Sequence, residues 1–444
     1  MVAIDVQPFR TVEDQGFREL VRCLDSRYEL PSRNTILNVH IQKLYENGKT
    51  KLQAILNEIE SCAITTDCWS SKANESYLTV TCHFIDGDFK IRSAVLTTSK
   101  LANELNHSAA NISVSLRECL QKWNIFQKVN CEVTDNAASM SKACELLQNR
   151  HLPCFAHSIN LVVQDLLCTE KVKALLSNCK HIVAYFKSST IAYAKLKKEQ
   201  GSEKQYSLIQ EVSTRWNSAF AMVQRILLIK DAIFAVLLRT PKAPPVLTAE
   251  EIEQLQDVCL LLEPFNTYIS ILSGNKYVTI SHVIPIAWGL HSTLMKLQSK
   301  LKTFVGSEAQ LYLCDKIKQR LFPYESRSAT RLATLLDPRF KKEGFQSGQN
   351  AAQASMLLEN ELVEIDRIAA SSLNDNREGP STSKSVKIPQ IYEFLKEKLS
   401  SKVKSNRADA IITLREYTEK PNEPLDVDPL EYWKVAMAFC VTLI

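Results

Sequence analysis

The sequence has 444 residues, of which 45% are hydrophobic and 23% charged, and this composition predicts two or three globular domains. No apolar run reaches the roughly 18 residues that a membrane span needs, and residues 1–10 lack a basic stretch leading into an apolar one, so neither a membrane protein nor a secreted protein is expected. The thirteen Cys are scattered through apolar segments, which is typical of a reducing compartment. A net charge of +5 does not by itself indicate nucleic acid.

The first part of the chain is predicted to change from helices to strands near residue 61. Apolar residues at helical spacing predict an N-terminal helical segment over residues 1–60. Three β-branched runs then predict an antiparallel meander, followed by alternating helices and strands. The strands are expected at 62–67, 76–86, 89–101 and 129–135 and from 151, and the helices at 107–123 and 137–148. The order is β-β-β-α-β-α-β, which predicts one α/β domain over residues 61–168.

Helical periodicity dominates after residue 168. We expect a large all-α domain over residues 169–370, with breaks at the Pro-rich stretch 240–246 and at Pro264. Seven Lys within residues 171–200 indicate either a local positive surface or a solvated helix face. Residues 371–388 are polar and rich in Ser, which predicts a flexible linker before a last helical segment over 389–444.

Two acids are expected where strands end. Asp67 follows the run Ile64–Thr66 and precedes a predicted Cys-Trp-Ser-Ser turn, and Asp135 ends the fourth strand. The predicted element order is that of an RNase H-like fold, in which the first and fourth strands are neighbours, so both carboxylates are expected at one edge of the sheet. Carboxylates in this arrangement suit Mg²⁺ and two-ion phosphoryl transfer. The alternative is that each acid caps the turn or helix that follows it.

Seven segments, in order between about Phe9 and Lys434, resemble those of hAT-superfamily DNA transposases. The match is nearest to the vertebrate zinc-finger BED-type proteins derived from them. The segments are ITTDCWSS, VTDNAASM, CFAHSINLVVQD, STRWNS, LLEPF with the downstream VTISHVIP, LATLLDPRFK and DPLEYWK. In that family a helical insertion domain interrupts an RNase H-like core, so the resemblance implies that residues 169–370 are the insertion.

The resemblance also implies roles for the two acids. Asp67 and Asp135 correspond to the first two metal-binding acids of the family's Asp-Asp-Glu triad, with Mg²⁺ as the expected metal. The third is the Glu of a Ser-Glu-Arg motif, and no such triplet occurs in the 444 residues. Glu416 and Glu431 are acids near the expected place, but neither lies in that motif. The catalytic site is therefore expected to be vestigial or incomplete.

Two further pairs match family elements. Cys154 and His157 match a Cys-x-x-His element beside the active site, and they are assigned either to DNA binding or to packing, since a structural zinc normally needs four ligands. Arg215 and Trp216 match an Arg-Trp element that lies near the cleaved DNA end in active relatives. An aromatic residue beside a cation can stack on an unpaired base while contacting phosphate. The alternative is that Trp216 anchors a hydrophobic core.

No Cys-x-x-Cys pair occurs, so no BED zinc finger is expected in this chain, and residues 389–444 resemble only the start of the family's C-terminal dimerisation region. The resemblance implies a nuclear location, DNA as a partner, and homo-oligomers or assemblies with other transposase-derived proteins. We expect a non-catalytic protein that associates with DNA or chromatin in transcriptional regulation. The alternatives are a metal-dependent DNA transposase, or a fragment of one whose third acid lies outside this chain, and a truncated gene product without a settled function.

Overall fold

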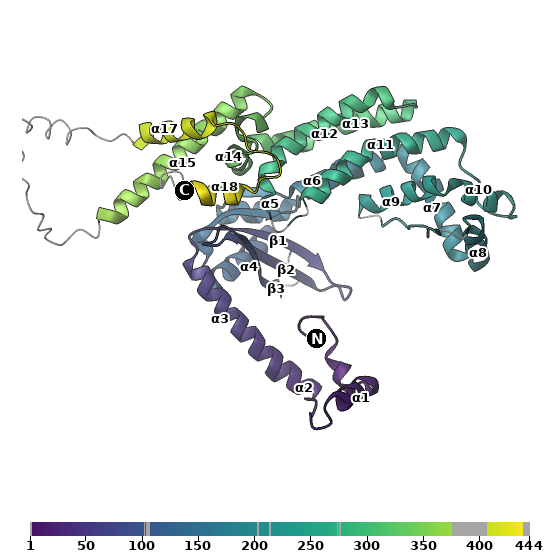
Figure 1. Cartoon of the computed structure of the whole chain (residues 1–444), viewed down its shortest axis with the longest axis horizontal. Helices are drawn as coiled ribbons and strands as arrows, with labels where there is room; N and C mark the ends of the chain where they lie inside the picture. The colour runs from purple at the N-terminus through teal and green to yellow at the C-terminus, as the bar shows by residue number, and fades with distance from the viewer. Residues whose placement is uncertain are drawn as a thin grey trace, which may run out of the picture. The chain divides into compact units, whose positions relative to one another are not determined.

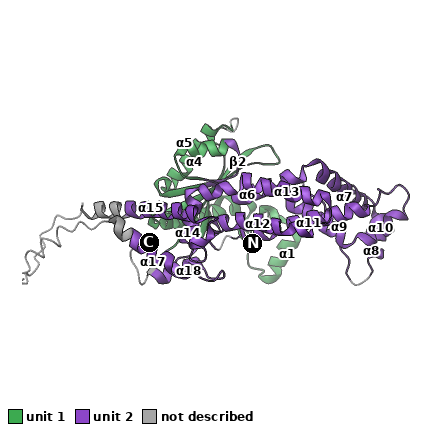
Figure 2. Ribbon diagram, turned by 90° about the horizontal axis from the view of Figure 1, so that it is seen from above, with its two compact units in different colours: residues 1–86, 92–132, 139–151 green, residues 87–91, 133–138, 152–444 purple. Residues whose placement is uncertain are grey.

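The structure is a computed structural model that describes residues 2–101, 103, 107–201, 204–212, 215–272, 274, 277–374 and 406–437 (Figure 1). Contacts between residues divide the chain into two compact units. Unit 1 comprises residues 1–86, 92–132 and 139–151, and unit 2 comprises residues 87–91, 133–138 and 152–444 (Figure 2).

Unit 1 begins with helices, as the periodicity of residues 1–60 predicts. They are η1 (Phe9–Glu13), α1 (Gln15–Leu24), α2 (Arg33–Thr35), the π-helical turn η2 (Ile36–Ile41) and α3 (Gln42–Glu58). Ser32 caps α2, because its Oγ accepts a hydrogen bond from the amide of Thr35 at 3.1 Å. Of the residues in α3, Leu56 is buried, and it joins the core formed by the strands that follow.

A five-stranded sheet follows, with the strand order β3-β2-β1-β4-β5. The strands are β1 (Cys62–Ser70), β2 (Ser76–Ile85), β3 (Ile91–Lys100), β4 (Val129–Thr134) and β5 (His151–Pro153). β1 and β2 are antiparallel, with Ala63 opposite His83 and Ser70 opposite Ser76. Buried residues alternate along β2 and the first half of β1, so one face of these strands packs on the core. β1 and β4 are neighbours, as the element order predicts.

Helices between the strands complete this core. They are α4 (Ala109–Lys122), η3 (Phe126–Lys128) and α5 (Ala138–Leu147), so the order from Cys62 to Pro153 is β-β-β-α-β-α-β with one added 3₁₀ turn. Ile64 and Val80 from the sheet, Leu116 and Leu120 from α4, and Met140 from α5 are all at most 2% exposed and belong to one apolar cluster. Burying such side chains contributes about 1.5–3 kcal/mol each.

The end of β1 differs from the prediction. The expected turn at Cys68–Ser71 is wrong, because the ladder with β2 continues as far as Ser70. Trp69 stabilises this extension: its ring stacks on that of Tyr77 with centroids 4.9 Å apart, and its Nε1 donates to Thr79 Oγ1 at 3.1 Å. The chain turns instead where the amide of Ser71 donates to the carbonyl of Glu75 at 2.8 Å.

Unit 2 is helical from residue 155 onward in the parts that the structure describes, apart from an isolated bridge between Val212 and Arg215. Its elements are α6 (Phe155–Leu167), α7 (Glu170–Ser188), α8 (Thr190–Glu199), α9 (Trp216–Leu228), α10 (Lys230–Leu238), α11 (Ala249–Leu272), η4 (Ile280–His282), α12 (Val283–Leu297), η5 (Gln298–Lys300), α13 (Phe304–Arg320), η6 (Phe322–Ser326), α14 (Ser328–Leu336), η7 (Lys341–Gly344), α15 (Gly348–Asn374), α17 (Asn406–Glu419) and α18 (Pro429–Met437). Within the described chain, none of the helices combines the length and the apolar character that crossing a bilayer requires.

One helix of unit 2 corrects a second prediction. α11 continues through Pro264, so the break expected there is wrong. Proline cannot donate to the carbonyl four residues earlier. Leu261, Leu262 and Phe265 beside it are at most 1% exposed, and their burial holds the surrounding turns in place. The break expected at 240–246 is confirmed, since it falls between α10 and α11.

The predicted linker is described only at its beginning. Its first four residues, 371–374, are the last residues of α15, so the helix extends past the expected boundary. The remainder, 375–388, lies outside the described residues. Of the last predicted segment, 389–444, the structure describes residues 406–437, which contain α17 and α18.

Candidate functional site

Asp67 lies inside a strand. It is the sixth of the nine residues of β1, opposite Thr79 of β2, and its side chain is exposed. The expectation that Asp67 ends its strand is therefore wrong, for the reason that the Trp69 contacts prolong the ladder. Exposure in a strand interior leaves the carboxylate accessible to solvent on the face opposite to the buried Thr66 and Ile64.

Asp135 directly follows β4, as predicted. Its side chain is partly buried, and its Oδ1 accepts a hydrogen bond from the amide of Ala137 at 3.2 Å. This bond across two residues is an Asx-type turn, which leads the chain into α5. The structure thus bears out the capping alternative for Asp135, and an accepted amide does not prevent the second oxygen from binding a cation.

Asp67 lies in unit 1 and Asp135 in unit 2. The strand order makes their strands neighbours, and each acid provides oxygen ligands of the kind that Mg²⁺ prefers. In the parts of the chain that the structure describes, no three His, Cys, Asp or Glu side chains lie close enough together to hold a metal ion. No third described ligand therefore accompanies either acid, and metal binding by Asp67 and Asp135 stays a prediction.

Cys154 lies beside the turn that carries Asp135. It is the residue before α6, its amide donates to the carbonyl of Thr134 at 2.7 Å, and its carbonyl accepts from the amide of Ser158 at 3.0 Å. The thiol is free and partly buried, and His157 is partly exposed on the first turn of α6. The backbone of Cys154 therefore joins the end of β4 to the start of α6, a structural contact that the packing alternative anticipates.

A buried hydrogen-bond chain starts one residue after Asp135. The Nδ2 of Asn136 donates to Ser158 Oγ at 2.8 Å, Ser158 Oγ lies 2.8 Å from the hydroxyl of Tyr324, and Tyr324 donates to the carbonyl of Pro153 at 2.9 Å. Since the one Tyr324 proton goes to Pro153, the Ser158 hydroxyl donates to Tyr324. Burial raises the pKa of Tyr324 to about 12. A neutral phenol thus connects η6 to the start of α6.

Trp216 is a core residue. It is 1% exposed at the first turn of α9, and its ring centroid is 6.1 Å from that of Phe220. A fully buried indole presents no face to a base in this conformation, which agrees with the packing alternative, and DNA binding by Trp216 stays a prediction. Its Nε1 is buried without a hydrogen-bond partner among the described atoms. The neighbouring Arg215 is exposed and remains accessible to a phosphate.

Comparisons with known proteins match two adjacent regions of the chain. Residues 65–156 match the ZBED1 RNase-like domain, and residues 152–261 match the ZBED1 RNase-like helical domain. The chain is 28% identical to zinc finger BED domain-containing protein 4 of Homo sapiens, over 99% of this chain and 38% of that protein. The resemblance expected from the motifs is confirmed.

Two further relatives are similar to this chain over about three quarters of its length. A Zea mays protein named as an AC transposase is 28% identical over 76% of this chain and 43% of its own length. A Talaromyces stipitatus protein named as the transcriptional regulator tpeD is 27% identical over 77% of this chain and 43% of its own length. The chain thus spans about two fifths of the length of these relatives. It is similar to BED-type zinc finger proteins and AC transposases over most of its own length.

The RNase-like match contains Asp67 and Asp135, and the helical match contains His157, Arg215 and Trp216. Both matches contain Cys154. The predicted residues thus all fall within the two matched regions.

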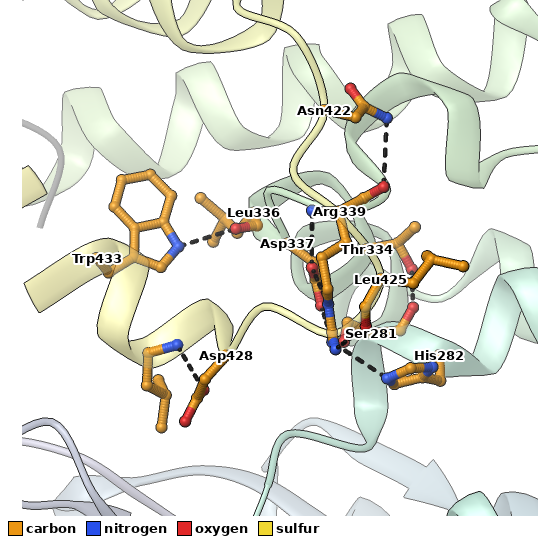
Figure 3. A network of polar contacts seen from close by, with 11 residues as sticks. Ser281, His282, Thr334, Leu336, Asp337, Arg339, Asn422, Leu425, Asp428 and Trp433 are labelled. Atoms are coloured by element: carbon orange, nitrogen blue, oxygen red, sulfur yellow. Dashed lines mark hydrogen bonds and ion pairs between the residues drawn. The ribbon is translucent and has the colours of Figure 1, made fainter.

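Beyond the matched regions, the family segment LATLLDPRFK forms a buried polar joint (Figure 3). The guanidinium of Arg339 donates to both oxygens of Asp337, from Nε at 2.9 Å and from Nη2 at 2.7 Å. Nη2 also lies 3.1 Å from His282 Nε2. Burial and the adjacent Arg339 charge lower the pKa of His282, which favours a neutral ring that accepts from the guanidinium. The Asp337 side chain is 1% exposed, and Arg339 is the cation that pairs with it.

The same segment holds the C-terminal helices. Trp433 of DPLEYWK donates from Nε1 to the carbonyl of Leu336 at 2.9 Å, and Lys341 donates from Nζ to the carbonyls of Lys420 and Pro421 at 2.8 and 3.0 Å. Lys341 is 1% exposed, and desolvation lowers its pKa. Sequence reasoning missed this joint, although the Asp-Pro-Arg-Phe-Lys run, with two cations close to an acid in an apolar context, was an available signal.

Proposed function

We propose that this chain is a hAT transposase-derived nuclear protein that associates with DNA or chromatin in transcriptional regulation and does not cleave DNA. The observation that carries the proposal is the similarity over 99% of the chain to a zinc finger BED domain-containing protein. A relative named as a transcriptional regulator supports the regulatory part. Self-association, or assembly with other transposase-derived proteins, belongs to the same proposal, since the resemblance extends into the start of a dimerisation region.

The non-catalytic part is supported by the contacts of the expected site residues. Trp216 is buried in the helical core, and Asp135 uses one carboxylate oxygen to cap the turn before α5. Cys154 joins β4 to α6 through its backbone. Each of these residues thus has a structural role that does not depend on cleavage chemistry.

A metal-dependent transposase, or a fragment of one whose third acid lies outside this chain, is the second candidate. It is favoured by the exposure of Asp67 and the partial exposure of Asp135, because carboxylates that reach solvent can bind a cation. The two candidates differ in what they predict for DNA in the presence of Mg²⁺ or Mn²⁺.

The test incubates the purified chain with labelled hairpin and terminal-repeat DNA in Mg²⁺ or Mn²⁺, beside the Asp135→Asn variant. We expect no metal-dependent product from either protein. Cleavage by the wild type that is lost in Asp135→Asn would replace the non-catalytic proposal with the transposase. Cleavage that persists in Asp135→Asn would indicate a contaminating nuclease, which a second purification of both proteins removes.

A further inference from the structure

The positive charge of the chain is concentrated in one stretch. Residues 170–245 carry thirteen Lys and Arg against five Asp and Glu, a net charge of +8. Because the whole chain carries +5, the remaining residues carry −3. The stretch contains α7 to α10, whereas α11, directly after it, contains five acids and no Lys or Arg. Such segregation differs from the mixed charges of an ordinary solvated helix face.

The lysines of α7 are spaced to form a row. Lys173, Lys180 and Lys187 are seven residues apart, which places them within about 40° of one another around a helix of 3.6 residues per turn. Leu176 and Val183 between them are buried, so the row runs along the flank of the packed face. From Lys173 to Lys187 the row is about 21 Å long, or about six base pairs of duplex.

α8 carries further exposed cations. It packs against α7 and α10, and its exposed side includes Lys195, Lys197 and Lys198. Lys197 lies over the ring of Tyr193, with Nζ 5.2 Å from the centroid. The two helices therefore present their cations from one packed body of unit 2.

Most of these cations are not neutralised. Among the described residues, the ion pairs of the stretch join Lys180 to Glu211 at 2.8 Å, Arg239 to Glu199 at 2.8 Å, and Lys171 to Glu308 of α13. We define the lysine face as Lys173, Lys187, Lys195 and Lys198. All four side chains are exposed, and none has an acidic partner within 4 Å among the described residues.

Tyr206, in the segment after α8, contacts two more cations, Lys204 and Arg225 of α9. Gln200 holds Tyr206 by two hydrogen bonds, from its Nε2 to the Tyr206 carbonyl at 3.1 Å and from the Tyr206 amide to its Oε1 at 2.7 Å. Lys204 Nζ and the Arg225 guanidinium lie 5.2 and 4.9 Å from the centroid of the Tyr206 ring. The positions of these cations are therefore fixed by contacts with the ring.

We propose that the lysine face, with the adjoining Lys204 and Arg225, binds the phosphate backbone of duplex DNA without reading its sequence. The inference rests on the proposed association with DNA and names the surface responsible. Lysine is suited to this role because its ammonium is a point charge that meets phosphate in many orientations. Contacts of this kind supply affinity that is independent of sequence and decreases steeply with salt.

The test measures binding of the full chain to a labelled 30-base-pair duplex of arbitrary sequence by fluorescence anisotropy between 50 and 200 mM salt. The test variant combines Lys173→Ala, Lys187→Ala, Lys195→Ala and Lys198→Ala. The control variant combines Lys296→Ala, Lys300→Ala, Lys302→Ala and Lys318→Ala, which removes the same charge from exposed positions of α12 to α13. Circular dichroism verifies that both variants keep the wild-type helix content.

We expect the test variant to bind at least tenfold more weakly at 50 mM salt and to lose about three to four from the slope of log K against log salt, since each phosphate contact contributes about 0.9. The control should stay within threefold of the wild type. Equal losses in both variants, or none in the test variant, would overturn the inference and leave DNA association standing. No binding by the wild type would instead remove the association itself. Tighter binding of a single strand of the same sequence would overturn the assignment to duplex DNA.

Discussion

The hydroxyl of Ser158 lies 2.8 Å from the hydroxyl of Tyr324, although 166 positions separate them in the sequence. The bond connects the start of α6, next to the turn of Asp135, with the 3₁₀ turn η6 that follows α13. The ring of Tyr324 also meets Phe155 edge to face, with centroids 4.9 Å apart. One tyrosine thus holds the start of α6 against η6.

Replacing Tyr324 by Phe should destabilise unit 2 by about 1–2 kcal/mol, because the ring contact stays while the Ser158 hydroxyl loses its partner and the Pro153 carbonyl its donor. Urea unfolding followed by circular dichroism measures the effect. The control is Tyr193→Phe, since the Tyr193 hydroxyl donates no hydrogen bond to a described residue and only its ring contacts Lys197. An equal change in both variants would contradict a specific role for the Tyr324 hydroxyl.

This connection was not predictable from the sequence, whereas the elements that it joins were. β-branched runs and helical spacing indicate local structure, and β1 to β5 and α4 to α6 occur in the predicted order. A hydrogen bond between residues that are 166 positions apart produces no periodic pattern in the sequence. α6 packs against α13, and η6 directly follows α13 in the chain. The meeting of α6 and η6 therefore becomes known only when the helices are arranged in space.

The positions of the candidate site residues were likewise predictable from the sequence only in part. Asp135 was predictable because a strand ends just before it, but Asp67 lies inside β1 because the stacking of Trp69 on Tyr77 prolongs the strand beyond the expected turn. The burial of Trp216 depends on helix packing, which a sequence motif does not predict. The motifs indicated the residues, and tertiary packing set their burial and their contacts.

Replacing Arg339 by Met should cost about 3–5 kcal/mol of unfolding free energy, because it leaves the buried Asp337 carboxylate without its cation. The matched control is Arg27→Met. Arg27 pairs with Asp25 at the same spacing of two residues, but the side chains there are 90% and 50% exposed, so the cost should be below about 0.5 kcal/mol. Urea unfolding measures both, and a loss no larger for Arg339 than for Arg27 would refute the structural role of the joint.

Glu132 should make the stability of unit 1 depend on pH. It is fully buried, Asn149 Nδ2 donates to its Oε1 at 2.7 Å, and its Oε2 has no partner among the described residues. Desolvation raises the pKa of Glu132, against the opposing hydrogen bonds of Asn149 and Cys144. The folded state therefore holds this proton to higher pH than the unfolded state, and stability falls as pH rises from the unfolded pKa through the folded one.

The Glu132→Gln variant removes this titration. The unfolding free energy of the variant minus that of the wild type should increase between pH 4 and pH 8. The reason is that only the wild type must bury a charged carboxylate at the higher pH. Urea unfolding at several pH values measures the difference. A difference that stays constant, or that decreases with pH, would show that Glu132 does not titrate in this way.

Replacing Trp216 by Ala should lower the unfolding free energy by about 3–5 kcal/mol, because a large side chain leaves a packed core. Arg215→Ala is the paired control, since that side chain is exposed and its loss should change stability by less than about 0.5 kcal/mol. Thermal unfolding distinguishes the two. Unchanged stability in Trp216→Ala would indicate that the indole is not held in the core in solution.

Association of this transposase-like chain with DNA is tested most directly by an anisotropy titration of the wild-type protein with a labelled duplex at 50 and 200 mM salt. We predict saturable binding at 50 mM salt that weakens by at least a hundredfold at 200 mM, as expected when several phosphates are neutralised. The absence of binding at 50 mM salt would contradict it.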